Sequence, residues 1–153
     1  MCLKTNQAMW AWARKDIECY KVLDTYSGNA FWTPYRRERV PDDAIEGKKC
    51  FRAQGKVEMR EICYPGSQLY EVEGGVIHAF VDREGAIKMA RSFLGAVSID
   101  IEAIPSIFKC IIPRGTRYLM GIESEGQICA KRIKFVEKIS YSTKDANAEW
   151  IES

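Results

Sequence analysis

Closely spaced turn signals are the feature that most constrains this chain, because they divide it into short segments. Between the glycines and prolines lie runs rich in β-branched and aromatic residues. The last third shows this most clearly: Pro113–Thr116 separates Ile107–Ile112 from Arg117–Ile122, and the turn at Glu123–Gly126 precedes Gln127–Ile139. This pattern predicts antiparallel strands joined by tight connections.

Further strands are predicted wherever apolar runs lie between turn signals. Their ranges are 17–25, 30–35, 50–52, 56–63, 68–72, 76–81 and 97–102. The segment from Arg36 to Lys49 is rich in charge and contains Pro41 and Gly47, so it is predicted to be an irregular loop.

One helix is well marked, over about residues 82–95. Asp82 is a good N-cap, Glu84 stands in the first turn, and Gly95 is a natural stop. The spacing predicts one apolar face, made of Ala86, Ala90, Phe93, Leu94 and Val97. The alanines and tryptophans of Gln7–Lys15 are also compatible with a short N-terminal helix.

These elements predict a single α+β domain over residues 1–153, dominated by antiparallel strands. A chain of 153 residues with 46% hydrophobic residues can bury one core, which we expect over about residues 16–140. The polar run 141–153 is expected to form a loose C-terminal tail.

The cysteines indicate free thiols. The chain has six cysteines but no C-x-x-C pair, and it has one histidine, so no metal site is predicted. Cys19, Cys110 and Cys129 stand in apolar strand-like runs, as small buried hydrophobes do. No secretory signal and no membrane span is recognised, so a cytoplasmic protein without a membrane partner is expected.

The single histidine restricts the available mechanisms. Any His-dependent catalysis would rest on His78 alone, which alternation places on the same strand face as Val76 and Phe80. No G-x-S-x-G, phosphate loop or G-x-G-x-x-G accompanies it. These observations favour a protein without catalysis, in which His78 is a structural group or the wall of a pocket.

One segment interleaves aromatic residues with arginines, as single-stranded nucleic-acid sites do. Its candidate contacts are Trp32, Tyr35, Arg36, Arg37 and Arg39. The formal net charge of the chain is only +2, whereas nucleic-acid binders carry an extended basic surface. Nucleic-acid binding is therefore kept as a second alternative.

The segment Cys110–Gly121 resembles the strand-turn-strand of arginine-specific and toxin-type ADP-ribosyltransferases. The segment Gly75–Asp82, followed by a helix, is similar to the corresponding strand and helix of the poly-ADP-ribose branch. The order of segments also resembles small domains of unknown function from phages and gut bacteria. The transferase resemblance implies NAD as the cofactor and a catalytic carboxylate.

The sequence departs from the transferases where their chemistry resides. Their Glu-x-Glu or Gln-x-Glu pair, which precedes this strand, falls on Ile107 and Lys109. A lysine would repel the developing oxocarbenium ion. An NAD-dependent enzyme would then need a relocated carboxylate, with Glu123 and Glu125 as candidates beside His78.

The leading interpretation is a cytosolic bacterial or phage-type binding or accessory module without a cofactor. Its partner would be a small molecule or a protein. The aromatic and mildly polar strands predict a ligand pocket lined by Tyr20, His78, Phe80 and Tyr118. The ADP-ribosyltransferase-like enzyme is the first alternative.

Overall fold

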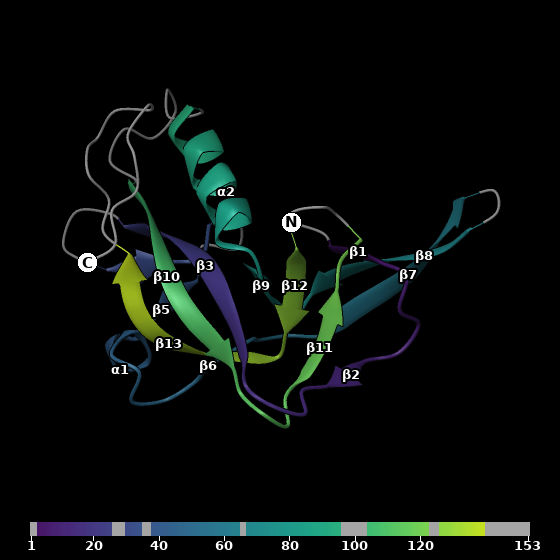
Figure 1. Cartoon of the computed structure of the whole chain (residues 1–153), viewed down its shortest axis with the longest axis horizontal. Helices are drawn as coiled ribbons and strands as arrows, with labels where there is room; N and C mark the ends of the chain where they lie inside the picture. The colour runs from purple at the N-terminus through teal and green to yellow at the C-terminus, as the bar shows by residue number, and fades with distance from the viewer. Residues whose placement is uncertain are drawn as a thin grey trace.

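The computed structural model describes residues 3–25, 30–34, 38–64, 67–95, 104–122 and 126–139. Its strands are β1 (Leu3–Thr5), β2 (Ala11–Trp12), β3 (Ile17–Thr25), β4 (Phe31–Trp32), β5 (Arg39–Val40), β6 (Phe51–Arg52), β7 (Val57–Tyr64), β8 (Ser67–Gly74), β9 (Ile77–Phe80), β10 (Ile104–Ile112), β11 (Arg117–Met120), β12 (Gln127–Ala130) and β13 (Arg132–Ile139). The helices are α1 (Asp42–Ile45) and α2 (Arg83–Gly95). A β-rich fold with antiparallel pairing and one substantial helix confirms the α+β prediction at this coarse level (Figure 1).

The larger sheet curls back on itself. Its strand order is β2-β11-β12-β9-β3-β10-β13-β6, and Lys131 alone separates β12 from β13. The path from β12 through β9, β3 and β10 to β13 therefore starts and ends on adjacent segments of one chain. We call these five strands the ring.

The main core fills the inside of the ring. Every ring strand contributes buried residues to it, and neighbouring elements add others: Cys19, Leu23, Ile77, Ala79, Phe108, Cys110, Ile112, Ile128, Ala130, Ile133, Phe135, Phe51, Val40 and Ala44. The phenyl group of Phe135 lies near two other aromatic side chains. Its centroid is 5.3 Å from that of Phe108 and 6.3 Å from that of Phe51. Such interdigitation of inward-facing residues is what closes a small barrel-like sheet.

Helix α2 covers part of the outer face of the ring. Ala86 and Ala90 are fully buried against Val22, Ile107 and other ring residues, as the helical periodicity predicts. The helix is described as far as Gly95, the last residue of the predicted range 82–95. The side chains of Phe93 and Leu94, and all of Val97, lie outside the described part of the chain.

A smaller sheet packs beside the ring in the order β1-β8-β7. Leu3, Val72 and Val76 form a core with Leu119 and Cys129 of β11 and β12. The hairpin β7–β8 projects on the opposite side of the molecule from α1 (Figure 1).

Two local predictions are wrong. Gln7–Lys15 contains strand β2 and bends rather than a helix, because Ala11 and Trp12 pair with Tyr118 and Arg117 of β11. The segment 36–49, predicted to be irregular, holds β5 and the one-turn helix α1 in its described part. The predicted strand 97–102, residues 123–125 of the predicted turn and the tail 141–153 lie outside the described residues.

Candidate functional site

A cavity of about 460 Å³ opens beside the ring where β3 and β9 diverge. This volume is in the range of small-molecule sites. Its lining comprises Lys21, Thr33, Pro34, Glu38, Phe51, Ala53, Lys56, Glu58, Glu73, Gly74, Val76, Ile77, His78 and Met89.

The pairing of β3 with β9 explains why the cavity lies here. Tyr20 of β3 pairs with Phe80 of β9, and no further pair joins the two strands in the described part of the chain. Beyond this pair the two strands diverge, with Lys21 on β3 and His78 on β9. Both residues line the cavity. Alternation along each strand directs Lys21 inward with Cys19 and Leu23, and His78 outward with Phe80. Both residues line one cavity because the sheet is parted between them.

Lys21 is the charged group most deeply placed in the lining. It is 6% exposed and stands between Cys19 and Leu23 of the ring core. Burial lowers the pKa of Lys21 from 10.5 to about 8. The neighbouring Cys110 and Cys19 thiols and, more weakly, the carboxylates of Asp24 and Glu38 act electrostatically in the opposite direction on this pKa. Glu38 also shares the cavity with Lys21.

The rest of the lining divides into an apolar wall and a polar mouth. Phe51, Val76 and Ile77 are buried, whereas Lys56 and Glu58 are exposed. Exposed Glu73 lies directly opposite Glu58 in the β7–β8 pair. The cavity therefore offers apolar contact inside and charges of both signs at its entrance.

The β4–β5 connection forms another side of the cavity. The backbone N–H of Glu38 donates to the Thr33 hydroxyl at 2.9 Å, and the Thr33 N–H donates to the Glu38 carbonyl at 2.8 Å. These reciprocal bonds hold the two lining residues together although they are five positions apart.

The predicted ligand-binding residues are distributed unevenly. His78 lines the cavity, whereas Tyr20, Phe80 and Tyr118 are absent from its lining. Tyr20 and Phe80 pack in the cluster under α2, and Tyr118 packs against the ring core.

The other predicted residues lie partly outside the described chain. Of the nucleic-acid set, Trp32 is half-buried on β4 and Arg39 is 3.7 Å from Asp42, while Tyr35, Arg36 and Arg37 are not described. The candidate carboxylates Glu123 and Glu125 are not described either. Lys109, which occupies the transferase carboxylate position, lies 3.5 Å from Glu18.

Most of the cavity lining was not anticipated from the sequence. Lys21 did carry a signal, because it interrupts the inward-facing alternation of Cys19 and Leu23. Phe51, Lys56, Glu58 and Met89 come together only through the folding of distant segments.

The three buried thiols, Cys19, Cys110 and Cys129, are poor metal ligands or nucleophiles. Burial raises the pKa of Cys19 and of Cys129 to about 12, and it raises that of Cys110 well above 9.0. No group of three or more His, Cys, Asp or Glu residues suited to a metal ion occurs within the described ranges.

Comparison with known proteins gives no indication of function, so the functional argument depends on the cavity. No protein family, no curated protein and no solved structure matches the chain. Across the described residues, neither helix has the length and apolar character needed to cross a membrane.

Proposed function

We propose that this chain is a small-molecule-binding domain whose ligand occupies the cavity at the β3–β9 divergence. The observation that carries the proposal is the placement of Lys21, a charged side chain that is 6% exposed, in the lining of a cavity of about 460 Å³ beside the buried apolar residues Phe51, Val76 and Ile77. A buried ammonium costs free energy unless another group compensates it. A ligand that bears an anionic or carbonyl group would supply that compensation.

The lining supports an amphipathic ligand with an apolar body. Phe51, Val76 and Ile77 would contact the body, while Lys21 and His78 would orient a polar group. A few polar groups set in an apolar wall are typical of small-molecule sites. We propose binding without turnover as the function, in an accessory role.

The test uses 8-anilinonaphthalene-1-sulfonate, a fluorescent probe with an apolar body and one anionic group. We expect saturable one-to-one binding to the folded chain. Ala53→Trp places an indole in the lining and should weaken binding by about tenfold or more, since loss of a filled apolar site costs more than 1.4 kcal/mol.

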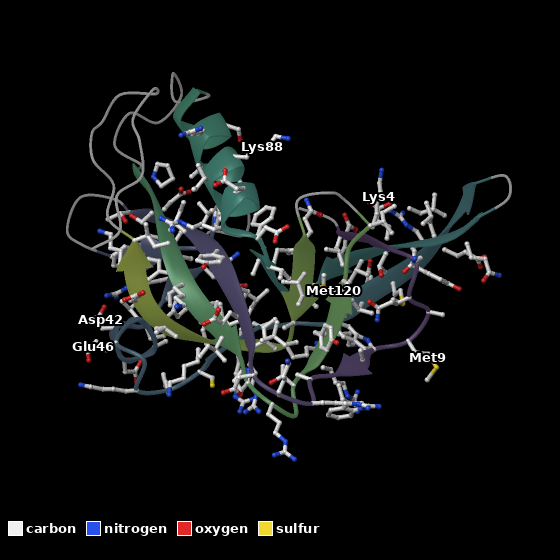
Figure 2. The ribbon with its side chains drawn as sticks, in the orientation of Figure 1. Lys4, Met9, Asp42, Glu46, Lys88 and Met120 are labelled. Atoms are coloured by element: carbon white, nitrogen blue, oxygen red, sulfur yellow. The ribbon has the colours of Figure 1, made fainter. Side chains whose placement is uncertain are left out.

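Met9→Trp is the matched control, because it adds the same indole at a side chain that is 79% exposed and projects from the molecular surface (Figure 2). It should bind the probe as the wild type does. Equal affinities for wild type and Ala53→Trp would overturn the cavity as the binding site. Near-ultraviolet circular dichroism would show that each variant keeps its packed core.

A parallel titration with NAD distinguishes the enzyme alternative. Under the proposal, NAD does not release nicotinamide in the presence of the protein. Release of nicotinamide at a rate proportional to protein concentration would overturn binding without turnover and favour a transferase.

A further inference from the structure

Lys21 occupies a position that suits covalent capture of a ligand. Its side chain leaves β3 toward the inside of the ring and contributes to the cavity lining with Phe51 and Ile77. Apolar surroundings disfavour the ammonium form and favour the neutral amine. The amine is the nucleophilic form of lysine, so a desolvated lysine in a cavity is a typical imine former.

The population of the amine follows from its pKa. With a pKa of about 8, roughly a quarter of Lys21 is neutral at pH 7.5. An ordinary exposed lysine has only about 0.1% of its amine neutral at this pH. Lys21 thus has on the order of a hundred times more of its amine in the neutral form than a surface lysine has.

We propose that Lys21 forms an imine with the aldehyde or ketone group of a small molecule that enters the cavity. This inference rests on the proposed function and names the chemical class of the ligand. It predicts a reversible covalent bond between the Lys21 Nζ and the carbonyl carbon.

The reaction balances without an oxidant or a reductant. The Nζ lone pair attacks the carbonyl carbon, an N–C bond forms, and the π electron pair moves to oxygen. A proton passes from nitrogen to that oxygen and gives a carbinolamine. The hydroxyl group then leaves as water, with one further proton, while the nitrogen loses its last proton and the C=N bond forms. In sum, one amine and one carbonyl give one imine and one water.

The cavity also contains groups that can move these protons. His78 and Glu38 both line it, and imidazole and carboxylate are common general acids and bases. Phe51 and Ile77, which are buried and also line the cavity, restrict water there and so favour dehydration to the imine.

The experiment traps the imine on the folded chain of 153 residues at pH 7.5. Benzaldehyde is added with sodium cyanoborohydride, and the labelled lysines are identified by peptide mass spectrometry. Lys48 is the internal control, because its side chain is 73% exposed and its hydrogen bond to Glu46 raises its pKa. We expect the initial labelling rate at Lys21 to exceed that at Lys48 by at least about tenfold.

The pH profile and two variants complete the test. The neutral fraction of Lys21, and with it the ratio of Lys21 to Lys48 labelling, should respond to pH around 8: the amine of Lys21 levels off above about pH 9, whereas that of Lys48 keeps rising. Lys21→Arg retains a cation but has no condensing amine, so labelling at this position should disappear. Ala53→Trp should slow Lys21 labelling without changing Lys48. Labelling of Lys21 no faster than that of Lys48 in the wild type would overturn the inference.

The two proposals fail separately. Saturable binding of 8-anilinonaphthalene-1-sulfonate without preferential labelling of Lys21 would retain the binding domain and refute imine formation. Preferential labelling that Ala53→Trp leaves unchanged would show a reactive lysine reached by another route, and would refute the cavity as the site of capture.

Discussion

Tyr20 of β3 lies directly opposite Phe80 of β9, and this pair is the sole register contact between the two strands in the described chain. Both side chains pack in the cluster beneath α2, together with Ala86 and Ala90. Helix α2 therefore packs over the single point at which β3 and β9 pair. Lys21 on β3 and His78 on β9 lie close to this point, and both line the cavity.

Replacement of Lys21 by methionine should change the pH dependence of stability. The folded-state pKa of about 8 lies below the ordinary 10.5, so between these values the folded chain has released a proton that the unfolded chain retains. Wild-type stability therefore rises with pH in this window, by about 1 kcal/mol per pH unit and about 3 kcal/mol in total, relative to Lys21→Met. Urea unfolding of both proteins at pH 7, 8, 9 and 10 measures the difference.

The Cys19 and Cys110 thiols are electrostatically coupled to Lys21, and thiol titration above pH 9 destabilises both folds. The difference between the two proteins at pH 7, 8 and 9, below this titration, is therefore the one that reports on the lysine. We expect Lys21→Met to be the more stable protein at pH 7, with its advantage shrinking toward pH 10. A constant difference across this range would contradict the burial of a titrating amine.

Gly75→Ala should strongly destabilise the fold. Gly75 has φ +27°, and an added Cβ would lie 2.7 Å from the Gly55 carbonyl oxygen and 2.8 Å from the Lys56 carbonyl carbon. Both neighbours are backbone atoms, so relief of the clash requires the backbone segments at Gly55–Lys56 and at Gly75 to move apart. We expect a loss of about 3 kcal/mol in the free energy of unfolding, by urea titration.

Gly115→Ala is the matched control for that prediction. Gly115 also has a positive φ, +85°, but an added Cβ would meet nothing within 4 Å. In this variant the free energy of unfolding should fall by only about 1 kcal/mol, the cost of placing an alanine at a positive φ. Equal losses in the two variants would argue against close backbone packing at Gly75.

Phe135→Ala should remove the centre of the ring core. Phe135 is 1% exposed and lies between Phe108 and Phe51, so the truncation leaves a cavity that its neighbours cannot fill. We expect a cost of about 3 to 5 kcal/mol in unfolding free energy. Val136→Ala, at the next position of β13 and 49% exposed, should cost less than about 1 kcal/mol.

Alkylation should discriminate among the cysteines. Cys19, Cys110 and Cys129 are buried, and burial raises their pKa values, whereas Cys50 is partly exposed. Iodoacetamide at pH 8 should therefore modify Cys50 at least about tenfold faster than the three buried thiols, as measured by peptide mass spectrometry. In urea the four rates should converge. Rapid labelling of Cys19 in the folded chain would indicate that the ring opens readily.

Local patterns in the sequence were sufficient for most individual elements. The strand Ile17–Thr25 has its predicted bounds, and α2 (Arg83–Gly95) begins within one residue of its predicted start, because alternation and helix capping depend on neighbouring residues. Burial of Cys19, Cys110 and Cys129 likewise follows from their apolar neighbours. Strands β1 (Leu3–Thr5) and β2 (Ala11–Trp12) were not predicted. They form by pairing with strands distant in the sequence, β1 with β8 and β2 with β11.

The tertiary structure alone decided where the cavity lies. Its lining combines Lys21, Phe51, Glu73 and Met89, which belong to four separate elements and have no common spacing in the sequence. The sequence places a lysine between two apolar, inward-facing residues, but it does not show that β3 and β9 diverge next to it. That divergence depends on long-range strand pairing, and it is what turns a buried lysine into part of a candidate site.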